Sequence, residues 1–307
     1  MAGIPKKYLG TFMKVRSTWI VGILLAGAAI PPHAQNRPAN PNPPAEATSP
    51  EAVVLGNDGK PMLLPFQCSE EDIRWAGMSC PEDAPCSVFL EIASVEALGN
   101  RVLLAGNIHG DSVTLYSLLL ASDDNGLSWQ ETHERIRGAG LDRIEHLGSG
   151  TAWIGGQVLF PFTRDPFLLI SMDGGKTWKQ REVLSEESES RFGSIQEFSF
   201  ATRDRGTLIL DRGAGGGSGR YALYESSNGG ETWTVKQESR KPIVVRRPPA
   251  PAPEWRVRPD AGTKSFVVEH RVGTRWSEVA AFLVGLDSCR PGGPLGNSAG
   301  PETGEKR

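Results

Sequence analysis

Residues 171–178 read Ser-Met-Asp-Gly-Gly-Lys-Thr-Trp. The same pattern, Ser-x-Asp/Asn-x-Gly-x-Ser/Thr-Trp, recurs at residues 122–129 and 226–233, so that the copies start about 50 residues apart. A period of this size indicates one supersecondary unit repeated along the chain. Each copy follows an apolar run and precedes another extended run, which is the sequence form of a β-hairpin with a glycine-containing turn.

The residue types of the pattern explain how such a turn is held. An Asp or Asn side chain accepts hydrogen bonds from the backbone N–H groups of its own turn, and glycine supplies a positive φ. The Ser or Thr hydroxyl adds a local bond, and the Trp covers apolar surface between neighbouring units. The twelve positions are Ser122, Asp124, Gly126, Trp129, Ser171, Asp173, Gly175, Trp178, Ser226, Asn228, Gly230 and Trp233.

The repeats predict an all-β fold. Residues 88–134, 141–184 and 194–239 each contain four short strand-like runs separated by turn residues, which is the pattern of β-propeller blades. A fourth unit at 242–284, with strands expected at 242–247, 255–258, 264–271 and 276–284, keeps Gly273 and Trp276 but has Arg271 in place of the Asp. A hairpin expected at 52–55 and 62–64 would complete the sheet at the other terminus and close the ring. We therefore expect about four blades, with five as the alternative.

The eight-residue pattern resembles the Asp-box, or BNR repeat, of β-propellers. That resemblance implies a structural turn on the rim, away from the binding face. A calcium loop at residues 123–126 is the rival reading, but the stretch lacks the alternating acidic ligands and the terminal bidentate Glu of such loops. No metal site and no cofactor are expected.

The two ends of the chain are expected to lie outside the propeller. Cations precede an apolar run at residues 19–30, which predicts a signal peptide over residues 1–34. Met13 is an alternative start, and retention of the segment as an anchor is the alternative to cleavage. Residues 35–51 read as a Pro-rich disordered spacer, 52–289 as the propeller, and 290–307 as a disordered tail.

Charge and cysteine content favour an exported protein. The segment 1–34 holds four Lys or Arg residues and no Asp or Glu, so its removal changes the net charge from −3 to −7. An acidic domain of this kind has no reason to seek nucleic acid. An even number of cysteines in an exported chain favours disulfides, and of the three possible connectivities we expect Cys80–Cys86 and Cys68–Cys289. The expected location is the periplasm or the outside of the cell, without an integral membrane span after signal cleavage.

A second resemblance suggests a class of function. Residues 150–156 read Gly-Thr-Ala-Trp-Ile-Gly-Gly and precede the second Asp-box-like turn. A Gly-x-x-Trp-x-x-Gly strand followed by such a turn is similar to repeats of the photosystem II assembly/stability factor family, over about residues 88–286 and at repeat level only. That family's propellers are non-catalytic and bind a membrane-protein assembly intermediate, and they have more blades. The resemblance implies a protein-binding scaffold, without implying a photosynthetic partner.

The competing resemblance is to sialidases and related glycoside hydrolases, which also contain Asp-boxes. Those enzymes need three arginines, a Tyr nucleophile with its Glu, and an acid/base Asp. Their Arg-Ile-Pro stretch is absent here, and Tyr116, Tyr221 and Tyr224 all fall inside expected strands. A glycan-binding or glycan-cleaving propeller is therefore the alternative function.

The loops opposite the Asp-box-like turns should form the binding face. Its candidates are His109, Asp111, Arg164, Asp165, Asp211, Arg212 and Arg220, and the loops between blades add Arg135, Arg137, Asp142, Arg143, Glu186, Glu187 and Arg191. Convergence of Asp111, Asp165 and Asp211 would favour a hydrolase, whereas an exposed cluster of Ile108, Phe160 and Phe162 would favour a scaffold. The sequence thus predicts an exported, non-catalytic propeller that binds a protein partner.

Overall fold

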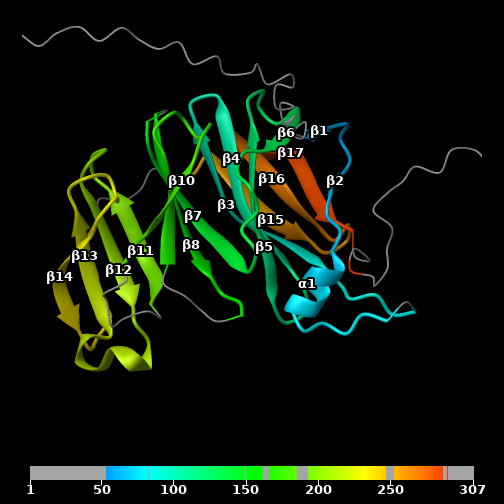
Figure 1. Ribbon diagram of the computed structural model, residues 1–307. Coiled ribbons are helices and arrows are strands. Elements are labelled where there is room, and N and C mark those ends of the chain that lie inside the picture. Colours follow the sequence, from blue (N-terminus) through cyan, green and yellow to red (C-terminus); the bar gives the residue numbers. More distant parts are fainter. Residues whose placement is uncertain are drawn as a thin grey trace, which may run out of the picture. The chain divides into compact units, whose positions relative to one another are not determined.

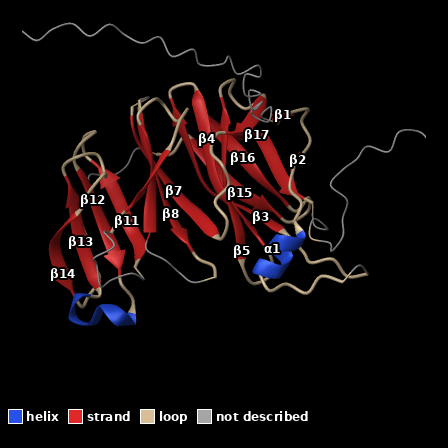
Figure 2. Ribbon diagram, in the orientation of Figure 1, coloured by secondary structure: helices blue, strands red, loops and turns tan. Residues whose placement is uncertain are grey.

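The computed structural model describes residues 53–81, 83–148, 150–161, 166–184, 193–246, 252–285 and 289. The expected signal peptide, spacer and C-terminal tail lie outside the described residues. Within them, strands dominate and helix is limited to two short segments (Figure 2). The search for long apolar helices in this part of the chain finds none that could cross a membrane.

The elements follow the chain in this order: β1 (Val54–Gly56), β2 (Met62–Leu64), α1 (Glu70–Trp75), β3 (Phe89–Leu98), β4 (Arg101–His109), β5 (Thr114–Ser122), β6 (Ser128–Glu131), β7 (Ala139–Leu147), β8 (Thr151–Val158), β9 (Pro166–Ser171), β10 (Lys179–Glu182), β11 (Ser194–Phe200), β12 (Gly206–Asp211), the 3-10 helix η1 (Ala214–Gly219), β13 (Tyr221–Ser226), β14 (Thr234–Ser239), β15 (Trp255–Asp260), β16 (Ser265–Val272) and β17 (Arg275–Val284). Figure 1 labels most of them.

The strands form four sheets, which are the blades of a β-propeller fold. Blade 1 has the order β1-β6-β5-β4-β3, blade 2 is β10-β9-β8-β7, blade 3 is β11-β12-β13-β14, and blade 4 is β15-β16-β17-β2. Neighbouring strands are antiparallel except for the parallel pair β17–β2. The all-β class and the four blades expected from the repeats are confirmed.

Three hydrophobic clusters hold the blades together, and each belongs to one boundary. The first joins blade 4 to blade 1, the second joins blade 1 to blade 2, and the third joins blade 2 to blade 3. Blade 3 therefore lies at one end of the row (Figure 1). Among the described residues no such cluster joins blade 3 to blade 4. The order of packing is thus 4-1-2-3.

One cross-strand pair on the open side of blade 3 differs in character from its counterpart on blade 1. Leu103 and Ala121 are paired on the side of blade 1 that blade 2 covers. The matching pair on blade 3 is Thr207 and Glu225. Glu225 forms an ion pair with Lys236 at 3.3 Å. Polar groups at these positions suit a terminal repeat, whose outer face needs no neighbour.

Each repeated turn packs on the blade before it. Gly126 lies against Val279 of blade 4, and its φ of +93° is one that side chains rarely adopt. The Trp129 ring meets Phe282 of the same blade edge-on, with centroids 5.3 Å apart. Gly175 lies against Leu103 of blade 1 in the same manner. A glycine is needed at these turns both for the backbone conformation and for the close approach.

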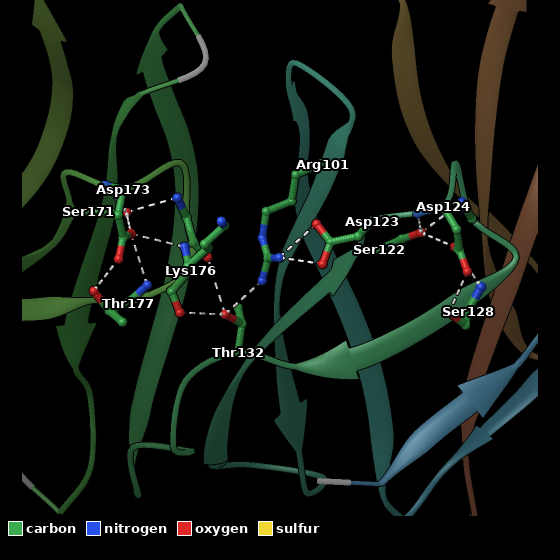
Figure 3. A network of polar contacts seen from close by, with 12 residues as sticks. Arg101, Ser122, Asp123, Asp124, Ser128, Thr132, Ser171, Asp173, Lys176 and Thr177 are labelled. Carbon is green, nitrogen blue, oxygen red and sulfur yellow. Dashed lines mark hydrogen bonds and ion pairs between the residues drawn. The ribbon is translucent and has the colours of Figure 1, made fainter.

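The side-chain locks of the first two turns are visible in Figure 3. Asp124 accepts a hydrogen bond from the Ser128 N–H at 2.8 Å and another from the Ser128 hydroxyl at 2.5 Å. Asp173 accepts the corresponding bonds from Thr177, at 3.0 and 2.6 Å. In the third turn the same role falls to an amide, because Asn228 Oδ1 accepts from the Thr232 N–H at 3.0 Å.

A polar bridge links blade 1 to the turn of blade 2 (Figure 3). Arg101, at the start of β4, donates to both carboxylate oxygens of Asp123 at 2.8 and 2.6 Å. It also donates to Thr132 Oγ1 at 3.2 Å, and Thr132 Oγ1 donates to the Gly175 carbonyl at 3.2 Å. Between blades 2 and 3 the corresponding link is the ion pair of Arg181 with Glu231.

The N-terminal strands complete two sheets rather than one hairpin. β1 pairs with β6 of blade 1, and β2 pairs with β17 of blade 4. Between them, Asn57 Nδ2 donates to the carbonyls of Gly126 and Val279 at 3.0 and 2.6 Å, and so ties blade 1 to blade 4. The expected completion of a C-terminal sheet by an N-terminal strand is confirmed, but the expected hairpin is wrong, because each strand finds a longer partner elsewhere.

The expected first strand of the fourth unit, at 242–247, is also wrong. No strand forms over residues 242–246, and Val244 is 83% exposed. Its apolar run has the composition of a strand, but a strand also needs a partner edge and a covering layer. Blade 4 is instead completed from the other side by β2.

Both expected disulfides are present. Cys68–Cys289 joins positions 221 residues apart, and Cys80–Cys86 closes a loop between positions six residues apart. Cys86 and Cys289 also form an isolated β-bridge, with the Cys86 N–H donating to the Cys289 carbonyl at 3.1 Å. The two ends of the propeller are therefore fixed to each other next to the start of β3.

Candidate functional site

A cavity of about 240 Å³ lies where the first strands of blades 1, 2 and 3 come together. It is lined by the beginning of β3, the end of β4, the beginning of β7, the end of β8 and the first residues of β11. These strand ends lie opposite the repeated turns, so the cavity belongs to the face that the sequence predicts for binding. We refer to it as the loop-face pocket.

Matching β-bulges shape this pocket. The first strands of blades 1, 2 and 3 each contain one irregular step, between Ile92 and Ser94, between Leu141 and Arg143, and between Ile195 and Glu197. A bulge leaves its extra residue outside the regular pairing and re-aims the side chain. The extra residues of blades 2 and 3 are Asp142 and Gln196, and both line the pocket as exposed side chains.

A buried amide fixes the pocket's floor. Asn107 is 6% exposed, accepts from the Leu141 N–H at 2.7 Å, and donates to the Leu141 carbonyl at 3.2 Å. The equivalent amide of the next blade, Gln157, donates to the Gly193 carbonyl at 2.7 Å. A side chain near the end of the second strand of one blade is therefore bonded to the start of the next blade.

An acid–imidazole pair forms one wall. Glu91 Oε2 lies 2.9 Å from His109 Nε2 and 3.2 Å from Asn107 Nδ2. The hydrogen bond from His109 lowers the pKa of Glu91 below its ordinary value, against the opposing effect of burial, and Asn107 adds to the lowering. On its other side His109 Nδ1 lies 3.2 Å from Thr114 Oγ1. Glu91 is therefore held as a carboxylate.

The remaining charges of the pocket come from blades 2 and 3. Asp142 and Glu197 contribute further carboxylates. Arg143 is the guanidinium of the lining, and its Nη2 lies 2.5 Å from Glu145 Oε1. Acidic side chains from three blades thus surround one small cavity, whereas both basic side chains of the lining have carboxylate partners.

The other loop-face candidates divide into three groups. Asp111 is exposed and does not line the pocket, whereas Arg164 and Asp165 lie outside the described residues. Asp211 accepts two hydrogen bonds from Arg220 at 2.8 and 2.9 Å, on either side of η1. Arg212 donates to the Tyr224 hydroxyl at 2.6 Å and to Glu238 at 2.5 Å. Asp211 and Arg220 are therefore partners of each other, Arg212 is held by β13 and β14, and none of the three lines the cavity.

Asp165 and Phe162 lie outside the described residues, and the described members of the two discriminating arrangements do not come together as expected. Asp111 and Asp211 do not converge on a shared cavity, as a hydrolase reading expects. Ile108 is fully buried in the cluster between blades 4 and 1, and Phe160 packs edge-on against Trp75 at 4.7 Å instead of forming an exposed apolar group. The exposed apolar residue of the pocket lining is Leu159, at 42%.

Helix α1 covers part of the same face and is not among the elements predicted from the sequence. Its sequence signal is a capping box: the Ser69 hydroxyl accepts from the Asp72 N–H at 3.1 Å, while the Asp72 carboxylate accepts from the Ser69 N–H at 2.9 Å. Asp72, 4% exposed, also accepts from the Tyr116 hydroxyl at 2.5 Å and from Arg137 at 2.7 Å. Burial, followed by the bond to Asp72, raises the pKa of Tyr116. This cluster anchors α1 on blade 1.

Comparisons with known proteins give no family. No family model matches the chain, and a search of the curated proteins finds no similar sequence. Solved structures that are similar include YCF48 from Cyanidioschyzon merolae (18% identity, TM-score 0.31, covering 63% of this chain and 56% of that one) and a polysaccharide lyase, PL25 ulvan lyase (11%, 0.37, 68% and 54%). A third is Trypanosoma rangeli sialidase with 2,3-difluorosialic acid (13%, 0.35, 66% and 33%). The matches span between a third and just over half of these chains. At such identities and TM-scores they carry no argument about this chain's activity or partners.

Proposed function

We propose that this chain is an exported, non-catalytic β-propeller that binds a partner protein at its loop face, centred on the loop-face pocket. The observation that carries the proposal is the pocket itself. Three blades contribute hydrogen-bonding and charged side chains to one cavity, on strands that Asn107 and Gln157 hold in register. A rigid, pre-organised polar cavity is what a recognition site requires.

The electrostatics of the pocket favour binding over hydrolysis. A glycosidase needs one carboxylic acid with a raised pKa opposite an ionised carboxylate. Glu91, the acid of the wall that pairs with His109, has a lowered pKa, mainly because of the hydrogen bond from His109. The Tyr nucleophile of sialidase-like chemistry also has no counterpart in the lining, and Tyr116 is engaged with Asp72 and Arg137.

The apolar surroundings favour a protein over a glycan. Sugars pack on the open faces of aromatic rings, but Phe198, the aromatic residue of the lining, is 1% exposed. Leu159, in the pocket lining, is 42% exposed and is aliphatic. Apolar side chains beside a polar cavity are the usual anchors of a protein interface.

Export is supported by the cysteines and by the N-terminal sequence. All four cysteines are engaged in disulfides, which persist in oxidising compartments. The predicted leader at 1–34 fits the same location. The Asp-box resemblance and the similarity to photosystem II assembly/stability factor repeats agree with a scaffold of this kind.

Affinity capture tests the proposal. The full chain, produced with export and carrying a C-terminal tag, is passed over envelope extract of its host, and bound material is identified by mass spectrometry. Leu159→Glu places a charge at the pocket rim, whereas Met172→Glu is a matched control, because Met172 is also 42% exposed but lies in the turn of blade 2. One protein recovered near stoichiometry, lost with Leu159→Glu and retained with Met172→Glu, supports the proposal. Recovery of polysaccharide, or elution by free sugars, supports the glycan-binding alternative instead.

A further inference from the structure

We propose that the loop-face pocket receives a basic side chain, arginine or lysine, presented by the partner protein. This inference rests on the proposed function and specifies its chemistry. It follows from the size of the cavity, from the sign of its charges and from the positions of its acceptors.

The size of the pocket suits one side chain. Small-molecule sites typically enclose about 300–1,000 Å³. The loop-face pocket, at about 240 Å³, is smaller. A single extended side chain that enters from a docked surface fits such a volume, and Leu159 in the lining supplies an apolar contact for the segment that bears it.

The charges of the pocket select a cation. Glu91 lies on blade 1, Asp142 on blade 2 and Glu197 on blade 3, so carboxylates approach the cavity from three sides. The basic groups of the lining are each drawn to an acid, His109 to Glu91 at 2.9 Å and Arg143 to Glu145 at 2.5 Å. An anionic group entering here would be repelled by these carboxylates, of which Glu91 is already bonded to His109, whereas a guanidinium or ammonium could bond to Asp142.

The bulges place the acceptors where a cation could reach them. Asp142 and Gln196 are the extra residues of their strands, and both are exposed toward the cavity they line. Asp142 supplies carboxylate oxygens and Gln196 supplies an amide oxygen. Five donors in a planar fork, or three on an ammonium, can bond to several such acceptors at once.

Peptide titrations test this inference directly. The probe is acetyl-Gly-Arg-Gly-amide, and its matched control is the same peptide with neutral citrulline in place of arginine. Amide chemical shifts of the full chain are followed by NMR during each titration. We expect millimolar binding of the arginine peptide with shifts confined to residues around Leu141 and Ile195, and at least about 5-fold weaker binding of the citrulline peptide. Raising the salt concentration should weaken binding of the arginine peptide but not binding of the citrulline peptide.

Variants test whether peptide binding depends on the carboxylates of the pocket or on the negative charge of the whole face. Asp142→Asn should weaken binding of the arginine peptide about 5-fold, and Asp142→Asn with Glu197→Gln should weaken it further. Asp111→Asn is the control, because Asp111 is an exposed acid on the same face outside the cavity. Equal binding of the arginine and citrulline peptides, shifts elsewhere than the pocket, or no binding at all would overturn the inference. If partner capture still depends on Leu159 in that case, the proposed function stands and only the basic ligand is wrong.

Discussion

Asn107 on β4 and Leu141 on β7 exchange two hydrogen bonds across the boundary between blade 1 and blade 2, at 2.7 and 3.2 Å. The contact occurs at the bulge of β7, where regular pairing with β8 is interrupted. One buried side-chain amide therefore satisfies both backbone groups of Leu141 and sets the distance between two walls of the pocket.

Replacement of this amide should destabilise the propeller. Asn107→Ala removes the two bonds to Leu141 and a third to Glu91, and leaves buried backbone groups without partners. The expected loss is about 2–4 kcal/mol in the free energy of unfolding. Urea unfolding followed by tryptophan fluorescence measures it. Gln196→Ala, at an exposed pocket position, should change stability by less than about 0.5 kcal/mol. Equal stability of the two variants would show that the Asn107 contact is unimportant.

The repeated turns should give the protein an acid-sensitive stability. Hydrogen bonds from Ser128 lower the pKa of Asp124 to about 2. Burial pushes the pKa of Asp173 upward, but bonds from Thr177 outweigh it and bring the pKa to about 2. Because both pKa values are depressed in the folded state, this stabilisation is complete above the unfolded value of about 4 and is lost as the pH falls toward 2.

The third turn supplies the control for this effect. Asn228 bonds to the same two groups without titrating: it accepts from the Thr232 N–H, and its amide donates to the Thr232 hydroxyl. The double variant Asp124→Asn and Asp173→Asn should therefore fold, and its melting temperature should fall less between pH 4 and pH 2 than that of the unchanged chain. Thermal melts by circular dichroism at half-unit pH intervals measure this. If the melting temperatures of both proteins fell equally between pH 4 and pH 2, Asp124 and Asp173 would not be the source of the acid sensitivity.

His146 on β7 should have the opposite effect on the pH dependence of stability, because its contribution decreases as the pH rises. The Glu96 carboxylate, whose Oε2 lies 3.6 Å from His146 Nε2, raises the pKa of His146 above its ordinary value of about 6.5 despite partial burial, and the Gly148 carbonyl adds to the effect. A raised pKa means that the stabilisation is present below about pH 6.5 and is lost as the pH rises through the folded-state pKa. NMR titration of the imidazole checks the shift, and Glu96→Gln should lower the pKa. An unchanged value in that variant would exclude Glu96 as the cause.

The two disulfides should differ in their contribution to stability. In the chain-entropy model a loop of about 220 residues stabilises by about 5 kcal/mol, and a loop of about 7 residues by about 2 kcal/mol. Replacing Cys68 and Cys289 by serine should therefore lower the free energy of unfolding more than the same change at Cys80 and Cys86. Chemical denaturation of the two double variants compares them. A larger loss at the short loop would mean that local geometry, not loop entropy, decides.

The repeats allow the blades to be predicted, because each turn pattern specifies its own local geometry. The side chains of Ser122, Asp124 and Ser128 bond to one another and to their own turn, so eight residues suffice to identify the hairpin. The cysteine pairing follows from the same reasoning, since strands at opposite ends of the sequence complete one another's sheets. The turn patterns and the pairing of the two ends of the chain can therefore be predicted from the sequence.

The pocket is harder to predict, because it depends on register. A bulge at Asp142 looks like ordinary alternation in the sequence, and that residue was expected in a loop between blades, not within β7. Glu91, Gln157 and Gln196 gave no sequence signal at all, since single polar residues in strands are common. Likewise the run at 243–245 has the composition of a strand, and only the missing contact between blades 3 and 4 explains its exposure. Packing between distant segments decides these features.

Site-specific photocrosslinking tests the central claim most directly. A benzophenone amino acid is placed at Leu159, on the pocket rim, or at Met172, in the turn of blade 2, and the exported full chain is irradiated in its host's envelope. The proposal predicts that position 159 crosslinks to one protein and that position 172, which is equally exposed, does not. Crosslinks of equal yield at both positions, or none to protein at position 159 while polysaccharide is retained, would contradict a protein-binding loop face.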